Sequence, residues 1–394
     1  IKYINILLNI YMPKKEKKVL YTINPKVKIK GQIKGDYKFT ISNIDASVAN
    51  AIRRTILTDI KTVVIKEKSD DGKMLINIVE NTSQFNNQIL IQRLGCIPVY
   101  NCSDGTNNEV CLRYELHCDI KNDKSEILNI TTEHFDIKDL QTNKYLKKTD
   151  VAKIFPPNKI SKDYIIFARL KPKVSNDIPG ESIKFNARFS LTNARENAMY
   201  NIVSTSAYGN TLNQEKIYDE RQKKEKELAE RKDMNESEID KYLLNWDNHD
   251  AKRYYIENSF DFIIKSLGVY QSNDIVIKAC NIIINNLEII QTLCDKQQIE
   301  LKENPIIMEN SWDIILQGYS YTIGKILEWI LHYKFYMEAN EMKYVGFLKP
   351  HPHDTHSIIR ISYIKKSNSN KNYVYLCLKE ACRLNILLFK NIMK

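Results

Sequence analysis

Two groups of side chains in this chain are of types that bind metal ions. Near-alternating histidines on a strand can share one face and coordinate zinc, and cysteine clusters do the same. The two groups are His351, His353 and His356, and Cys102, Cys111 and Cys118. The cysteine spacings are wide and lack the C-x-x-C pair of most zinc sites, and Pro350 and Pro352 indicate that the histidines lie in a turn entering a strand. We therefore predict no metal site and no cofactor.

The residues needed for catalysis do not form a recognisable set. Asp70 and Asp71 are adjacent carboxylates, but Gly72 follows them, which is typical of a turn. The sequence has no nucleophile–base motif, glycine-rich phosphate loop or HExxH. Two-metal nucleotidyl transfer needs several converging carboxylates, and no candidate triplet is visible. The sequence therefore predicts a chain without catalytic residues.

The adjacent Arg53 and Arg54 are the clearest binding candidates. Arginine side chains contact phosphate groups, and they also form bidentate pairs with carboxylates at protein interfaces. The chain has a net charge of +11, which favours nucleic acid or an acidic partner, although its lysines are spread throughout. A solvated basic surface is the alternative.

Length and composition indicate an ordinary globular protein. The 394 residues suffice for two or three domains, with 43% hydrophobic and 27% charged residues. Eight cysteines without a C-x-x-C pair indicate a reducing, intracellular environment. No apolar run approaches the ~20 residues of a membrane span. The opening IKYINILLNIY is short and broken by asparagines, and Met12 is a plausible true start.

The binding candidates need a framework, and the first part of it spans residues 33–61. Residues 33–44 alternate as a strand, and Asp45 is a suitable N-cap for a following helix. Val48, Ile52, Ile56 and Ile60 recur every four residues, which predicts one apolar stripe. The small residues between them would allow another backbone to approach closely.

Residues 62–206 are predicted to be rich in strands and loops. The expected strands are Val63–Lys66, Leu75–Val79, Val110–Ile120, Tyr164–Leu170 and Ile183–Leu191. Residues 213–247 are instead dense in Lys, Glu and Arg with few apolar positions. They predict an exposed helix held by ion pairs four residues apart, or a partly mobile insertion.

The strongest predicted helix is Asp274–Cys294. Its apolar residues alternate spacings of four and three, a seam suited to lengthwise packing against another helix. After Pro305 the pattern of the first segment returns: strand-like residues 306–316, a helix after Gly318 and Ser320, a strand at Ser357–Ile364, and a closing helix at Tyr373–Met393. Gly324 lies inside the first of these helices, where it costs ~1 kcal/mol relative to alanine unless a neighbouring backbone approaches.

We therefore predict an α+β fold of two related units that pack on each other as an intramolecular pseudo-dimer. The predicted organisation is an N-terminal extension (1–18), a discontinuous first unit (19–61 and 207–300), a β-rich inserted domain (62–206) and a second unit (301–394).

Two motifs of the first unit resemble those of the α-like assembly subunits of multisubunit RNA polymerases. These motifs are DASVANAIRRTILTDI (45–60) and NTSQFNNQILIQRLGCIPVY (81–100), close to the family's D-x-S-x-A-N-x-x-R-R and N-T-S…R-L-G-x-I-P. This unit resembles the third-largest subunit of eukaryotic RNA polymerase II, its archaeal D-type counterpart and the bacterial α subunit.

The second unit resembles the eleventh subunit and its archaeal L-type counterpart. Its matches are YTIGK (321–325) and GFLKPHPHDTH (346–356), although Tyr321 and Lys325 replace the family's His and Asn. Fusion of the two subunits in one chain is similar to the arrangement in large cytoplasmic DNA viruses, and the high Ile, Asn and Lys content fits an AT-rich genome. Many third-subunit relatives carry a zinc-binding cysteine cluster, which the spacing of Cys102, Cys111 and Cys118 does not match.

The resemblance implies a noncatalytic assembly platform of DNA-directed RNA polymerase. Its partners would be the two large catalytic subunits and small assembly subunits, with DNA or RNA contacted only through the complete enzyme and no membrane. It would be intracellular, in the host cytoplasm and virion if viral and otherwise in the nucleus. The alternative is a free-standing basic protein that binds nucleic acid or metal.

The resemblance also assigns residues to two kinds of contact. Partner-subunit contacts are expected at Asn50, Arg53, Arg54, Arg93, Leu94, Gly95, Ile97 and Pro98. The resemblance and the apolar seams together predict the residues through which the two units pair with each other. These are Ile52, Ile56, Val276, Ile283, Leu287, Ile290, Thr322, Ile323, Gly324, Leu327, Leu384 and Leu388.

Overall fold

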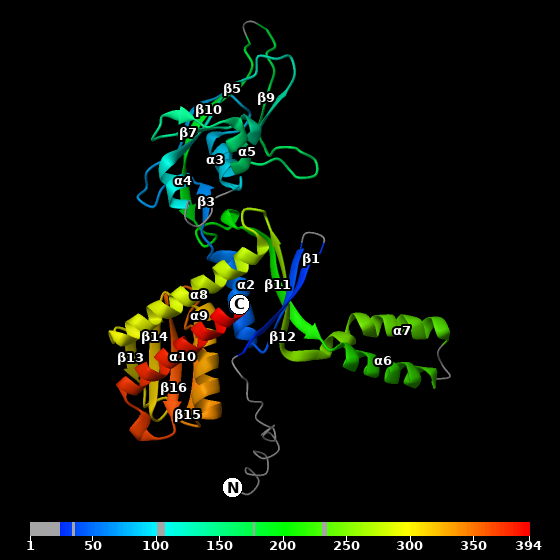
Figure 1. The fold of residues 1–394 in the computed structure, drawn as a ribbon, viewed down its shortest axis with the longest axis vertical. Coiled ribbons are helices and arrows are strands. Elements are labelled where there is room, and N and C mark those ends of the chain that lie inside the picture. The colour runs from blue at the N-terminus through cyan, green and yellow to red at the C-terminus, as the bar shows by residue number, and fades with distance from the viewer. Residues whose placement is uncertain (1–23, 34–35, 101–106, 176–177, 231–234) are drawn as a thin grey trace.

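The computed structural model describes residues 24–33, 36–100, 107–175, 178–230 and 235–394. Two sheet-and-helix units meet through their helices, a β-rich body lies above them, and a pair of helices projects to one side (Figure 1). The predicted extension 1–18 and Cys102 lie outside the described residues.

The first unit is an antiparallel four-stranded sheet with two helices, assembled from distant parts of the sequence. The strand order is β1-β2-β12-β11. Its elements are β1 (Lys26–Ile33), β2 (Asp36–Ser42), α2 (Ala46–Thr58), β11 (Val203–Leu212), β12 (Tyr255–Ser266) and α8 (Ser272–Asp295). Asp45 caps α2 as predicted, because its Oδ2 accepts a hydrogen bond from the Ser47 backbone N–H at 2.7 Å.

The second unit has the same strand order and the same succession of elements. Its sheet runs β13-β14-β16-β15, so each strand has a counterpart at the equivalent place in the first sheet. Its elements are β13 (Glu300–Glu303), β14 (Ser311–Gln317), α9 (Tyr321–Leu331), the π-helical η4 (His332–Glu338), β15 (Met342–Leu348), β16 (His356–Tyr363), η5 (Lys366–Asn368) and α10 (Lys371–Ile392). The exposed Ile306 and Ile307 precede β14, so the predicted strand begins at Ser311 rather than at residue 306.

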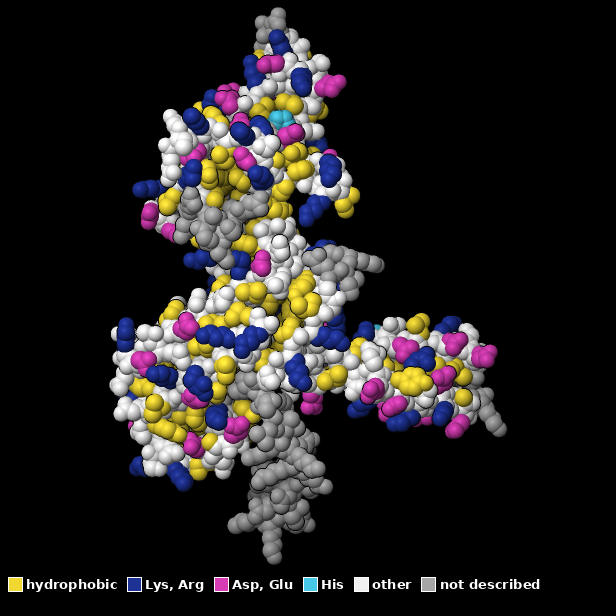
Figure 2. All heavy atoms as spheres, in the orientation of Figure 1, with side chains coloured by type: hydrophobic (Ala, Val, Ile, Leu, Met, Phe, Trp, Pro, Cys, Tyr) yellow, Lys and Arg dark blue, Asp and Glu magenta, His cyan; other side chains and the backbone are white. Residues whose placement is uncertain are grey.

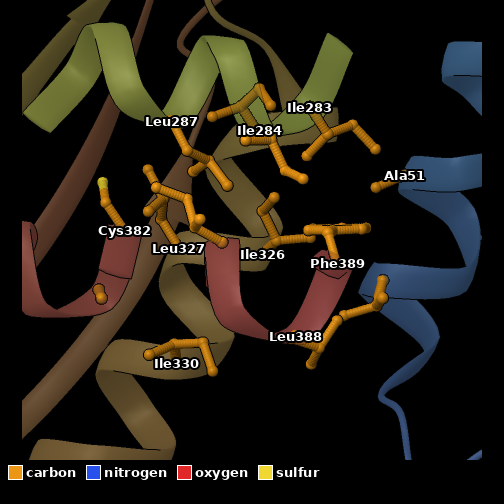
Figure 3. Packing of buried hydrophobic residues seen from close by; sticks show 14 of the residues in the cluster. Ala51, Ile283, Ile284, Leu287, Ile326, Leu327, Ile330, Cys382, Leu388 and Phe389 are labelled. Carbon is orange, nitrogen blue, oxygen red and sulfur yellow. The ribbon is translucent and has the colours of Figure 1, made fainter. Parts of the chain in front are cut away.

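Four helices, two from each unit, share one hydrophobic core. α8 packs along α10, and α2 packs against α9. α8 and α10 are antiparallel. Gln297, just after α8, donates from Nε2 to Asn372 Oδ1 at the start of α10 at 3.4 Å, and Val276 near the start of α8 lines one pocket with Ile392 at the end of α10. Figure 3 shows Ile283 and Leu287 of α8 pointing toward Ile326 and Phe389. One contiguous cluster of buried side chains therefore runs through both units.

Gly324 is needed because of an aromatic ring rather than a neighbouring backbone. A methyl group added at Gly324 would overlap the ring of Phe347 on β15. The same ring packs edge-on against Tyr321 at 5.1 Å between centroids. The expected close approach is therefore present, but it is made by a side chain of the same unit.

The β-rich body has its own sheet and its own hydrophobic core. Its sheet order is β3-β10-β5-β7-β8 with β4 also beside β10, and β6 pairs with β9 separately. Its strands are β3 (Thr62–Ile65), β4 (Ile76–Asn81), β5 (Tyr114–Lys121), β6 (Leu128–Thr131), β7 (Asp136–Asp139), β8 (Lys144–Tyr145), β9 (Ile166–Leu170) and β10 (Ser182–Thr192). Its helices are α3 (Asn87–Gly95), α4 (Asn107–Arg113), α5 (Lys148–Ile154) and the short η1 (Thr132–His134) and η2 (Ala198–Tyr200).

Two local predictions for the inserted regions were wrong. Residues 110–113 were expected to begin a strand, but they end helix α4, and the strand begins at Tyr114. The charged segment was expected to be one helix or a mobile insertion. It forms two helices, α6 (Gln214–Ala229) and α7 (Glu236–Asn248), followed by η3 (Asp250–Arg253). Buried Leu228, Leu243 and Trp246 explain the pairing, because three well-placed apolar side chains can join two otherwise polar helices.

α8 is also long and apolar enough to cross a membrane, judged by length and composition alone. No such stretch was expected from the sequence, in which Asn, Asp and Lys residues interrupt the apolar run. In the structure its apolar stripe is buried against the other helices, which is how the core helix of a globular protein meets the same test.

We predict that Ile283→Asp prevents folding. Ile283 is fully buried where the helices of both units meet, and truncating such a side chain alone costs ~2–5 kcal/mol. A buried carboxylate adds a desolvation penalty. Ile289→Asp, on the same helix but 52% exposed, is the matched control. Thermal melting of both variants checks this, and a soluble Ile283→Asp protein with unchanged melting would contradict the shared core.

Candidate assembly interface

The outer side of α2 carries Asn50 and Arg53 as one hydrogen-bonded unit. The Arg53 guanidinium donates from Nε and Nη2 to Asn50 Oδ1 at 3.1 and 2.9 Å. Both side chains are half-buried, whereas the apolar stripe Val48, Ile52 and Ile56 is buried on the opposite side. α2 therefore divides its two faces between the core and an accessible polar surface.

Arg54 points to the other unit of the same chain. Its Nε donates to Thr322 Oγ1 at the start of α9, at 3.2 Å. The two adjacent arginines therefore have different environments, because successive helical residues point about 100° apart. Arg54 was expected to contact a partner subunit. In the structure its side chain lies at the contact between the two units of this chain.

Arg93 ties two segments of the β-rich body together. Its Nε donates to the Phe167 carbonyl at 2.6 Å and its Nη2 to the Ile166 carbonyl at 2.9 Å. The guanidinium also lies over the Phe85 ring, 5.4 Å from the centroid. Arg93 therefore holds α3 against β9.

The loop after Arg93 presents only part of its surface. Leu94, Gly95 and Ile97 are buried within the β-rich body and at its base, so their side chains serve the fold. Cys96 is exposed and Pro98 is half-buried. If this loop contacts a partner, the contact falls to Cys96, Pro98 and the backbone, and that role stays a prediction.

The expected pairing residues belong to the four helices that share the core, although Gly324 faces the Phe347 ring of its own unit. Thr322, Ile323, Gly324 and Leu327 of α9 are buried, as are Ile52 and Ile56 of α2. In α8 and α10, Val276, Ile283, Leu287, Ile290 and Leu388 are buried, and Leu384 is half-buried at the edge of the same core.

A polar junction joins the β-rich body to the paired units, and sequence reasoning missed it. Arg195 Nη2 donates to Asp59 Oδ2 at 2.9 Å, which connects the turn after β10 to the end of α2. This bond raises the pKa of Arg195 above its ordinary value. The Tyr270 hydroxyl donates to the Lys61 carbonyl at 3.0 Å, and the Tyr100 hydroxyl to the Leu267 carbonyl at 2.9 Å. A cleft of about 240 Å³ opens beside this junction, lined by Asp59, Arg195 and the start of α9.

Within the described residues, no group of three or more His, Cys, Asp or Glu side chains is placed to hold a metal ion. Burial raises the pKa of Cys111 to about 11 and that of Cys118 to about 12, so both stay protonated thiols at neutral pH. The exposed His351 and His353 have ring centroids 5.1 Å apart in the loop before β16. Asp70 pairs with the buried Lys66 at 2.7 Å.

Comparison with known proteins specifies the class of protein to which this chain belongs. A family model described as the RNA polymerase Rpb3/Rpb11 dimerisation domain matches residues 38–287, from β2 into α8. The chain therefore belongs to the Rpb3/Rpb11 family of RNA polymerase dimerisation-domain proteins.

Individual relatives match a shorter stretch. Subunit 3 of DNA-directed RNA polymerases II, IV and V from Arabidopsis thaliana is 33% identical over 96 residues, which is 24% of this chain and 26% of the relative. DNA-directed RNA polymerase II subunit RPB3 from Schizosaccharomyces pombe is 32% identical over 93 residues, 24% of this chain and 29% of the relative. A conjugation stage-specific protein of Tetrahymena thermophila is 30% identical over 114 residues, 26% of this chain and 34% of the relative. The chain thus matches 26% to 34% of the length of these relatives.

We predict that Arg54→Ala lowers the stability of the folded chain while Arg53→Ala leaves it nearly unchanged. Arg54 donates across the contact between the units, and losing one such hydrogen bond typically costs about 1 kcal/mol. Arg53 bonds only within its own helix turn through its side chain. Urea unfolding of both variants checks this, and equal stabilities would argue against a structural role of Arg54.

Proposed function

We propose that this chain is a noncatalytic assembly subunit of a DNA-directed RNA polymerase. Its two units pair internally, and the paired body docks the two large catalytic subunits. The four-helix core shared by both units carries this proposal, because it forms within one chain the pairing after which the family is described. The family match supports the polymerase context.

The proposal includes a fusion of two subunits of different kinds. The two four-stranded sheets have equivalent strand orders, and each is followed by a long helix in the same position. This supports a third-subunit-like first unit paired with an eleventh-subunit-like second unit. We further propose that the chain is viral and acts in the host cytoplasm and virion. Two features support this: the fused organisation, which resembles that in large cytoplasmic DNA viruses, and the high Ile, Asn and Lys content, which fits an AT-rich genome.

The proposed partner surface is the accessible face of α2 together with the exposed part of the Arg93–Pro98 loop. Arg53 is preorganised there by Asn50, so less side-chain freedom is lost when a carboxylate binds. The apolar face of the same helix is occupied by the core. A large subunit would therefore contact α2 from outside without disturbing the pairing of the units.

We predict that the Arg53→Ala, Arg54→Ala double variant associates more weakly with a large subunit. Truncating one partner of a buried charge pair at an interface typically costs ~2–5 kcal/mol. Because Arg54→Ala alone affects stability, Arg53→Ala alone is the diagnostic variant and should retain most of the loss. Co-purification of the large subunits with each variant measures it, and normal assembly of both variants would refute the surface.

The function itself is tested by comparing the isolated chain with the assembled complex. The chain alone should incorporate no nucleotides on a DNA template, and incorporation should appear only when the large subunits co-purify. We expect the chain to need no metal, so a chelator should leave its melting temperature unchanged. A structural zinc would be obvious in this experiment, because it contributes ~10–16 kcal/mol of apparent binding energy in small domains. Incorporation by the chain alone would overturn the proposal. Stoichiometric zinc lost together with stability would instead point to Cys102–Cys118 or His351–His356.

A further inference from the structure

The pair of helices α6 and α7 joins the first unit at its base. Leu212 of β11 is opposite Tyr255 of β12, and the Asn213 backbone N–H donates to the Tyr254 carbonyl at 3.0 Å. The chain therefore leaves and re-enters the sheet at adjacent points, and the helices α6 (Gln214–Ala229) and α7 (Glu236–Asn248) project away from the body (Figure 1). We call this segment the α6–α7 hairpin.

The α6–α7 hairpin is held together by its own contacts. Leu228, Leu243 and Trp246 are buried, and Arg221 Nε bonds Asp247 Oδ2 at 3.1 Å to join the two helices. α7 begins with a capping box between Asn235 and Glu238. Its main packing partners are the two helices themselves and η3. The hairpin is therefore an ordered projection that the shared four-helix core does not need for its own packing.

Its charge is opposite in sign to that of the rest of the chain. Residues 214–248 contain eleven acidic and eight basic residues, a net charge of −3, and the chain's total of +11 leaves +14 for the remainder. A basic segment of another molecule would thus be attracted to the hairpin and repelled by the body. The charge difference therefore favours binding of a positively charged partner, and favours it at the hairpin rather than on the body.

Apolar side chains are exposed on the hairpin between the charged ones. Tyr218 is 61% exposed and Leu244 is 62% exposed. Each directly follows a less exposed residue, the half-buried Ile217 or the buried Leu243. In two antiparallel helices such positions lie on the same side of the pair. Figure 2 shows yellow side chains among blue and magenta ones on the hairpin.

Carboxylates border both of these exposed side chains. Glu215 lies one helical turn before Tyr218, and Asp240 one turn before Leu244. Among the described residues neither Glu215 nor Asp240 forms an ion pair. The face thus combines two apolar contact points with two carboxylates available to cations.

We propose that the α6–α7 hairpin docks a basic segment of another polymerase subunit, with Tyr218 and Leu244 as the apolar contacts and Glu215 and Asp240 as charge partners. This proposal rests on the assembly function proposed above. Because the hairpin stands away from the α2 surface, it would hold this segment without occupying the large-subunit surface around Arg53 (Figure 1).

The test uses the polymerase assembled on the tagged full-length chain. The Tyr218→Ser, Leu244→Ser double variant should release one subunit at a salt concentration that wild type withstands, with at least a tenfold loss of apparent affinity. Leu376→Ser, at an equally exposed position (61%) on α10, is the matched control and should behave as wild type. Both variants change only exposed side chains, and thermal melting verifies that they fold.

Zero-length carbodiimide coupling of the wild-type complex identifies what lies on the hairpin. Coupling of Glu215 or Asp240 to a lysine of the released subunit, lost in a Glu215→Gln, Asp240→Asn variant, supports the proposal. Coupling only to a second copy of this chain, no coupling at either carboxylate, or equal salt resistance of all variants overturns it. A wild-type chain that co-purifies with no polymerase subunit refutes the assembly function, whereas a complex that assembles but lacks these effects refutes the hairpin proposal alone.

Discussion

The burial of one apolar core between four helices is the constraint on which the rest of this structure depends. Each unit's sheet covers one side of its two helices, and the remaining apolar side chains of α8 and α10 are buried against the other unit. Since burying one such side chain contributes ~1.5–3 kcal/mol, the units stabilise each other through many of them. The relative placement of the two sheets, and of everything attached to them, follows from this contact.

The two insertions lie in loops of the first unit, at places that leave this core intact. The β-rich body enters between α2 and β11, and the α6–α7 hairpin between β11 and β12. The equivalent places in the second unit hold only the π-helical η4 and the loop 349–355. Loop ends that lie close together accept added chain at small cost in stability. The Asp59–Arg195 bond and the two tyrosine hydroxyl bonds then fix the β-rich body at its base.

Periodic apolar patterns predicted the helices well, because burial imposes the period that the sequence shows. The α2 stripe and the α8 seam are buried along their lengths. Individual polar contacts could not be predicted. The helical period places Arg53 and Arg54 about 100° apart, but which of them meets the second unit depends on how α2 and α9 cross. Residues 110–113 have strand-like character locally, yet tertiary context makes them helical. The α6–α7 hairpin was missed because few apolar residues carry its pairing, and its strongest signals are charges that also suit a single exposed helix.

The most direct measurement of the central claim is to divide the chain in the turn after α8, between Gln297 and Gln298, and to express the two fragments separately and together. Light scattering with size-exclusion chromatography would then give the mass of each product. The account predicts that neither fragment alone is a stable folded monomer, and that together they form a one-to-one complex with the circular dichroism spectrum of the intact chain. Two fragments that fold separately as stable monomers and do not associate would contradict it.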